Sequence, residues 1–265
     1  MSDYLFLSKI DNCIENYIYL NRYTPNRQEK ADGLINFKVG IFLQKFHENN
    51  WHLVDEKFFD NNESLFISSL EYDLSIGELL VVVPADSSKV FEKKYDELPK
   101  PLSRKVDLSP INERTEIGYR INDSFSSYQG EFPYKMSCFK GTFLSFDPLI
   151  QHAKGITNKL IFINIFSKKI KTKDIFQLHI ASANTKRKYK SYDYVNNSAL
   201  IIDIGNYNDE ICFYSKDTLG VPIFLSHDSN SIFSVEHTHP PSEFFWKNKF
   251  HAQSVLKSNW LNQLK

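Results

Sequence analysis

The side chains best suited to chemistry are gathered near the end of the sequence, in a string that runs from Val235 to Glu243. Its two histidines, His237 and His239, are separated by one residue, and a carboxylate stands on either side at Glu236 and Glu243. Imidazole and carboxylate groups are ligands that Zn, Fe, Mn and Ni take in proteins. Side chains alternate along a strand, so the two histidines would share a face and Glu236 would point away. The pattern therefore predicts one divalent metal bound by His237, His239 and Glu243, with a further ligand from upstream.

The string His-x-His-x-x-x-Glu resembles the first half of the cupin metal motif. The resemblance covers the seven residues from His237 to Glu243 and implies a metal centre set in β structure. This sequence departs from the motif in two places. Ser231 stands where a glycine is usual, and only 22 residues follow Glu243, which leaves no room for the strand that carries the last cupin histidine. The string His-Thr-His-Pro also resembles the JAMM metalloprotease loop, although the downstream serine and aspartate of that family are missing here.

The two histidines have a metal-binding and a structural interpretation. A metal would need an upstream ligand such as His227 or His179, because His251 falls in a predicted helix. In the structural alternative, the two prolines after His239 fix a turn between a strand and a helix, and the imidazoles cap backbone groups. Both interpretations stay open at this level.

The formal net charge of zero hides an uneven distribution of charge. Residues 48–97 hold 12 acidic and 4 basic side chains, whereas residues 154–190 hold 10 basic side chains and one acidic. We expect the basic residues at two turns, the first with Lys168, Lys169, Lys171 and Lys173 and the second with Lys186, Arg187, Lys188 and Lys190. If both turns lie at the same end of a sandwich, they form a positive surface for nucleic acid or another polyanion. The alternative is two solvated loops.

Length and composition are those of an ordinary globular protein. Of the 265 residues, 42% are hydrophobic and 24% are charged, and no stretch is long and apolar enough for a membrane helix. The start lacks the features of a signal peptide, and three scattered cysteines make no disulfide framework, so we expect a cytoplasmic protein without a membrane partner. Plentiful Lys, Asn, Ile, Phe and Tyr suggest an AT-rich bacterial or viral genome. Acyl-hydrolase, P-loop and Rossmann motifs are absent.

The first half of the sequence is expected to be mostly helical. Apolar residues recur at spacings of three and four over residues 4–20 and again over residues 34–48, which predicts two amphipathic helices. Short apolar runs at 64–70 and 78–83 predict strands. Four prolines interleaved with charges and serines predict an irregular connector in the middle of the chain. We therefore divide the sequence into an N-terminal α/β region (1–98), a connector (99–139) and a C-terminal region (140–265).

The C-terminal region is expected to consist of strands. Short runs rich in Ile, Phe and Val, separated by polar clusters, predict strands at 142–146, 159–166, 176–181, 199–204, 210–214, 222–226 and 232–236. Residues 226–231 read as a hairpin turn between the last two strands. Ser242 is a suitable N-cap for a closing helix, in which Leu256, Trp260 and Leu264 share one stripe.

These patterns predict an α+β fold, with a helical N-terminal region, a C-terminal antiparallel β-sandwich or barrel and a closing C-terminal helix. Three classes of function fit such a chain. The first is a non-catalytic interaction or assembly module, in which charged loops meet a protein partner or a second copy. The second is a metal-dependent enzyme or metal-binding protein that uses the His-x-His site on a small molecule or carbohydrate. The third is a polyanion or nucleic-acid binder that uses the lysine-rich turns.

Overall fold

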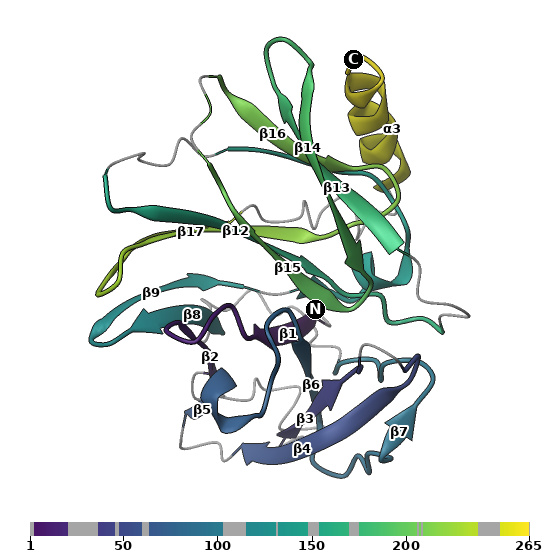
Figure 1. Cartoon of the computed structure of the whole chain (residues 1–265). Helices are drawn as coiled ribbons and strands as arrows, with labels where there is room; N and C mark the ends of the chain where they lie inside the picture. The colour runs from purple at the N-terminus through teal and green to yellow at the C-terminus, as the bar shows by residue number, and fades with distance from the viewer. Residues whose placement is uncertain are drawn as a thin grey trace, which may run out of the picture.

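A computed structural model describes residues 3–20, 37–45, 48–59, 64–102, 115–130, 132–147, 154–169, 175–205, 207, 209–237 and 250–264. Antiparallel strands in four sheets make up most of this part of the chain. One α-helix, α3 (Phe250–Leu261), lies near the C-terminus and is the only α-helix among the described residues. The predicted α+β fold class is therefore wrong: the described N-terminal residues form strands and one short 3-10 turn, η1 (Ser69–Glu71), and no α-helix (Figure 1).

Two sheets are built from the N-terminal half of the chain. One has six strands, in the order β10 (Phe132–Pro133), β1 (Asp3–Ser8), β6 (Leu79–Asp86), β3 (Phe37–Leu43), β4 (Trp51–Phe59) and β7 (Lys94–Tyr95). The other has four strands, in the order β5 (Leu65–Ser68), β2 (Glu15–Leu20), β8 (Glu116–Ile121) and β9 (Ser124–Gln129).

The two predicted N-terminal helices are strands for identifiable reasons. All six residues of β1 are buried, so the strand lacks the alternation that marks a half-exposed one. The Asp11 carboxylate then accepts hydrogen bonds from the amides of Cys13 and Ile14, both at 2.8 Å. This turn changes the spacing between the apolar residues of β1 and those of β2. In β3 every residue from Lys38 to Leu43 is buried, so this strand lacks the alternation as well. Without alternation, apolar residues also fall at spacings of three and four, which imitate a helix.

The predicted connector also contains regular structure. Strands β8 and β9 form a hairpin within residues 99–139, and β10 and a short 3-10 turn, η2 (Met136–Cys138), follow it. An irregular connector over this whole range is therefore a wrong prediction. The prolines lie outside the paired parts of β8 and β9, which explains why their density gave no warning of the hairpin.

The C-terminal half forms the other two sheets. The outer sheet has the order β11 (Phe143–Phe146), β16 (Ile211–Ser215), β13 (Ile175–Ser182) and β14 (Lys188–Val195). The middle sheet has the order β15 (Ser198–Asp203), β12 (Thr157–Asn164), β17 (Val221–His227) and β18 (Ile232–His237). All seven predicted strands and the 226–231 turn are confirmed, whereas β14 was not predicted. Helix α3 confirms the closing helix, although its predicted start at Ser242 lies outside the described residues.

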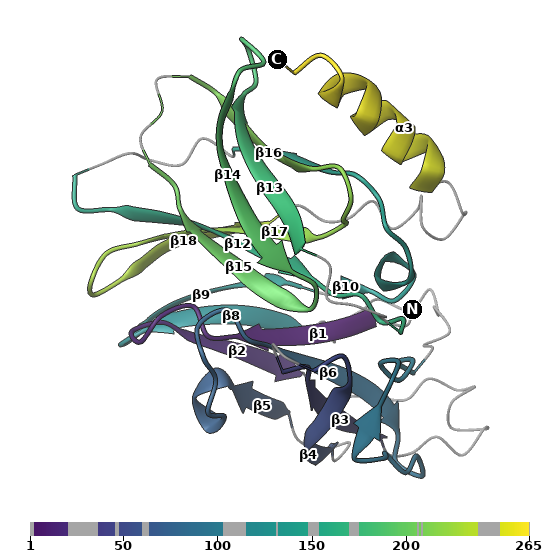
Figure 2. The ribbon, with the colours of Figure 1, turned by 45° about the vertical axis from the view of Figure 1, so that its right-hand side comes forward.

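The middle sheet is buried on both faces. Along β12, Leu160 and Phe162 pack into a core shared with the outer sheet, while the alternating Ile161 and Ile163 pack into a core shared with the N-terminal sheets. Figure 2 shows the resulting tiers, with β12, β17 and β18 running between the outer sheet and the N-terminal strands. Buried side chains from 1–98 and from 140–265 thus belong to one continuous hydrophobic core.

Helix α3 covers part of the far side of the outer sheet. Leu261 is buried there against Ala181, Cys212 and Tyr214, with Trp260 packed beside it. The Lys186 ammonium lies 3.6 Å from the centre of the Trp260 ring. Within the described residues, no helix has the length and apolar character needed to span a bilayer.

Candidate functional site

His237, the first of the two predicted metal ligands in the string, closes strand β18 at a junction between two sheets. Its imidazole lies 4.3 Å, centroid to centroid, from the ring of Tyr128 on β9. At the other end of the contact between β18 and β9, the Ser124 hydroxyl accepts a hydrogen bond from the Ile232 amide (3.0 Å) and donates to the Ile232 carbonyl (3.2 Å). The edge of the middle sheet is thereby held along the edge of an N-terminal sheet.

The structure brings neither upstream histidine to His237. Strand pairing places His237 opposite Ile223 and His227 opposite Ile232, at the two ends of the β17–β18 hairpin. Four residues of strand separate them along the hairpin, or roughly 13 Å. His179 belongs to the outer sheet, where its ring packs on Tyr214. Neither histidine can therefore share an ion with His237.

The metal-site hypothesis remains a prediction. His239 and Glu243 lie outside the described residues, so the structure does not place the ligand set of His237, His239 and Glu243. Among the residues that it does describe, no three His, Cys, Asp or Glu side chains are grouped closely enough to hold a metal ion. An ion at His237 would need at least one ligand from outside the described residues.

The two basic turns lie at opposite ends of one strand. Lys168 and Lys169 precede β13, whereas Lys186, Arg187 and Lys188 follow it. An eight-residue strand spans roughly 26 Å, so the two groups cannot form the single positive surface that the sequence allowed. Lys171 and Lys173 lie outside the described residues.

Carboxylates neutralise the first basic turn. The Lys168 ammonium lies 3.2 Å from the Glu97 carboxylate, and Lys169 pairs with Asp96. The hydrogen bond that Lys168 donates to Glu97 raises the pKa of Lys168, and the one that Lys169 donates to Asp96 raises the pKa of Lys169. Part of the charge complementarity between the acidic and basic stretches is therefore satisfied inside the molecule.

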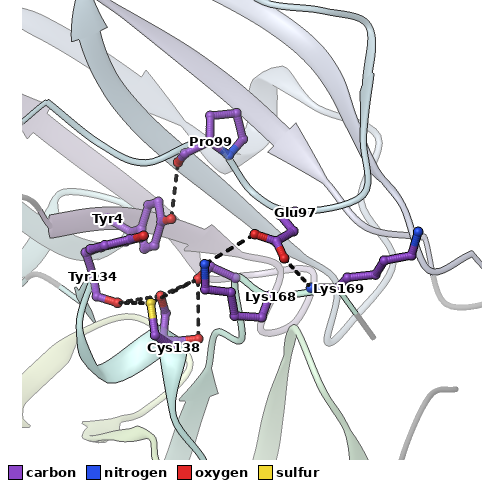
Figure 3. A network of polar contacts seen from close by, with 9 residues as sticks. Tyr4, Glu97, Pro99, Tyr134, Cys138, Lys168 and Lys169 are labelled. Carbon is purple, nitrogen blue, oxygen red and sulfur yellow. Dashed lines mark hydrogen bonds and ion pairs between the residues drawn. The ribbon is translucent and has the colours of Figure 1, made fainter. Parts of the chain in front are cut away.

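A buried polar network lies beside these ion pairs and was not foreseen from the sequence (Figure 3). The Ser137 hydroxyl donates to the Tyr134 carbonyl (2.7 Å) and contacts the Ser167 hydroxyl (2.8 Å). The Cys138 thiol donates to the same carbonyl at 3.3 Å. Nearby, the Tyr4 hydroxyl donates to the Pro99 carbonyl at 3.1 Å.

The network acts as a joint between segments that are distant in sequence. Its backbone bonds run from the Leu98 amide to the Ser167 carbonyl and from the Ser167 amide to the Ser137 carbonyl, both at 2.9 Å. Burial raises the pKa of the Tyr4 phenol, which stays protonated and serves as a donor. The Cys138 thiol donates to a backbone carbonyl, as expected of a structural cysteine. Contacts between residues separated by 30 or more positions leave no local signal in a sequence.

The second basic turn has a different character. It forms the end of the β13–β14 hairpin, and we call Lys186, Arg187, Lys188 and Lys190 the basic hairpin. None of these four side chains forms an ion pair with a carboxylate in the described part of the chain. Asp209, which lies beside the hairpin, instead accepts hydrogen bonds from Ser182 and Asn184. Those bonds lower the pKa of the Asp209 carboxyl.

Aromatic rings support the basic hairpin. Lys186 lies over Trp260, and the Lys190 ammonium is 4.6 Å from the centre of the Tyr192 ring. The rings of Tyr189 and Tyr207 stack at 5.2 Å. Cations held over aromatic faces keep their charge while their aliphatic stems are packed. Two of the four cations, Lys186 and Lys190, are therefore held in place as positive charges.

The basic hairpin continues into an edge strand. Strand β14 ends the order of the outer sheet, and among the described residues only one of its two edges is paired, with β13. Its first four residues, from Lys188 to Ser191, are exposed. The sequence placed these lysines at a turn, but the alternation in Tyr192 and Tyr194, whose rings pack toward the sandwich core, could have indicated a strand. No protein-family model, curated protein or solved structure matches this chain, so its geometry alone carries the functional argument.

Proposed function

We propose that this chain is a non-catalytic interaction module that binds an acidic protein partner at the basic hairpin. The observation that carries the proposal is the contrast between the two basic turns. Lys168 and Lys169 are neutralised by carboxylates of the same molecule, whereas the cations of the basic hairpin have no such partner among the described residues. Cations left unpaired and held in place favour association with an opposite charge.

The surroundings of the hairpin support a protein partner. Tyrosine and arginine are enriched in protein–protein interfaces, and both occur at the basic hairpin, as Tyr189, Tyr207 and Arg187. The rings are anchored by stacking, so little side-chain entropy is lost on binding. We further propose that the protein acts in the cytoplasm, because Cys13, Cys138 and Cys212 are free thiols.

Variants in which glutamine replaces basic residues test the proposal. Fluorescent poly-glutamate and a single-stranded oligonucleotide of equal length serve as probes, with anisotropy measured over a range of salt concentrations. We expect poly-glutamate to bind, and the triple variant Arg187→Gln, Lys188→Gln, Lys190→Gln to weaken that binding about tenfold or more. The control variant Lys168→Gln, Lys169→Gln removes two charges from the neutralised turn and should bind as the native protein does.

Three results would overturn the proposal. The first is no binding of poly-glutamate at low salt, and the second is equal binding by both variants. The third is much tighter binding of the oligonucleotide through the same side chains, with a steep salt dependence, which would assign the hairpin to a nucleic acid.

A further inference from the structure

We infer that the acidic partner binds as an added strand, in extended conformation, along the open edge of β14. This inference rests on the proposed function and specifies how the partner is held. A segment that joins a sheet edge gains affinity from backbone hydrogen bonds, and side-chain charges then select it. Both elements occur together on β14: an edge that no other described strand pairs with, and a cation, Lys190, held over the Tyr192 ring.

The hydrogen bonds of β13 reveal which amides of β14 face outward. The Ser182 amide donates to the Arg187 carbonyl on the β14 side, whereas the next amide, of Ala183, donates to Glu210 on the β16 side. Backbone groups alternate between the two sides of a strand. Counting back along β13, Ile180 and Leu178 face β14, and His179 and Gln177 face β16.

Strand register carries this assignment across to β14. Ser191 lies opposite His179 and Asp193 lies opposite Gln177, so neither pair exchanges backbone hydrogen bonds. Side chains approach most closely in such pairs. That expectation is met: His179 Nδ1 lies 2.7 Å from the Ser191 hydroxyl, and the Gln177 amide donates to the Asp193 carboxylate at 2.9 Å. The amide and carbonyl groups of Ser191 and Asp193 therefore point away from the sheet, toward the open edge.

Charge selects the occupant of this edge. Lysines on an edge strand discourage two copies of the same strand from pairing, because their like charges would meet. An acidic strand would instead place carboxylates beside Lys188 and Lys190, where opposite charges attract. A single-stranded nucleic acid would satisfy the charges but has no regularly spaced amides and carbonyls to match those of Ser191 and Asp193. An extended acidic polypeptide satisfies both.

The register also limits the length and polarity of the partner. The irregularity between Ile180 and Ala181 leaves Tyr189 without an opposite residue, so the regular edge begins at Lys190. At its far end, the Val195 carbonyl accepts the Ser198 hydroxyl. An antiparallel partner would run from Val195 toward Lys188, so its acidic residues belong at its C-terminal end. A neutral residue belongs opposite Asp193.

N-methylated peptides test the added-strand geometry directly. The probe is a synthetic peptide with alternating threonine and valine in its first half and glutamates in its second half. Two methylated forms carry N-methyl groups on alternate amides, one form for each edge of the peptide. We expect methylation of one edge to weaken binding about tenfold or more, because the hydrogen bonds to β14 are lost. Methylation of the other edge should leave the affinity within about twofold.

A protein variant probes the same geometry from the other side. Asp193→Pro removes an outward amide, a position at which an edge strand tolerates proline. We expect it to weaken peptide binding, whereas the control Asp193→Ala, which keeps the amide, should not. Suppose that both methylated forms bind as the plain peptide does, while the variant Arg187→Gln, Lys188→Gln, Lys190→Gln loses binding. The added strand is then wrong and the proposed function stands. If neither the plain peptide nor poly-glutamate binds, both fail; if poly-glutamate alone binds, only the added strand fails. The methylation result decides the question even if Asp193→Pro does not fold.

Discussion

The imidazole of His237 lies against the phenol ring of Tyr128, with 4.3 Å between ring centroids. Tyr128 is buried, and burial raises the pKa of its hydroxyl well above the usual range. The contact joins the last residue of β18 to β9 and so fixes the point from which the chain leaves the middle sheet. His237, which the sequence singled out as a metal ligand, therefore has a packing role that does not depend on a metal.

Metal analysis decides the metal-site hypothesis. If His237, His239 and Glu243 hold an ion, protein purified without a histidine tag should contain close to one equivalent of a divalent metal. The double variant His237→Ala, His239→Ala should lose it, because two imidazoles supply most of the binding. Inductively coupled plasma mass spectrometry measures both. A content far below one equivalent, or one that the double variant leaves unchanged, would reject the site, and His227→Ala serves as the control.

Asn197 is expected to be a key residue for stability. Its φ of 59° is left-handed, its side-chain oxygen accepts the Phe166 amide (2.6 Å), and its side-chain amide donates to Gln44 (2.7 Å). Asn197→Gly keeps the backbone relaxed and loses both bonds, which should lower the free energy of unfolding by about 1–3 kcal/mol. Asn197→Ala should cost about 1 kcal/mol more, since alanine resists this φ. Urea unfolding compares the two, and equal losses would contradict the backbone argument.

The thiol of Cys212 should report on the docking of α3. Cys212 is fully buried beside Leu261, and burial raises its pKa to about 11, so alkylation should be slow compared with that of the exposed Cys13. Trp260→Ala removes an aromatic anchor of the helix and should speed Cys212 labelling about tenfold. Leu256→Ala, at an exposed position of the same helix, should have no effect. Peptide mapping by mass spectrometry follows each thiol; rapid labelling in the native protein would contradict the packing.

His179 should make stability fall in mild acid. Burial lowers its pKa below the usual 6.5, with Lys188 and Lys216 acting in the same direction and Asp193 opposing them. In the unfolded chain the imidazole takes up a proton as the pH falls through 6.5, while the folded form resists it. Stability is therefore unaffected above this pH and is lost as the pH falls through the depressed folded value. Thermal unfolding between pH 8 and 5 should show a shallower decline for His179→Gln; parallel curves would argue against this assignment.

The sequence predicted the strands of the C-terminal half because they are short, apolar and separated by turn residues. It failed at β1 and β2, because strands buried on both faces lose their alternation and the turn at Asp11 imitates a helical period. Strand β14 was missed for the opposite reason. Its exposed lysines read as a solvated turn, although they lie on an edge.

The candidate site was only partly predictable. The sequence singled out Lys186, Arg187 and Lys188, but it could not separate them from Lys168 and Lys169. That distinction depends on Glu97 and Asp96, which lie about seventy positions away and meet the first group only in the folded chain. A count of charged residues along a sequence shows how many charges there are, whereas the tertiary structure decides which of them form ion pairs.

Strand β12 assigns neighbouring residues to different cores, Ile161 to one and Phe162 to the other. Its backbone hydrogen bonds link both cores to the same two partner strands, so loosening one core weakens the support of the other. We therefore expect a single cooperative unfolding transition. A fragment that begins at residue 140 would expose the apolar face formed by Ile161, Ile163 and Ile223 to water, and such a fragment would be prone to aggregate.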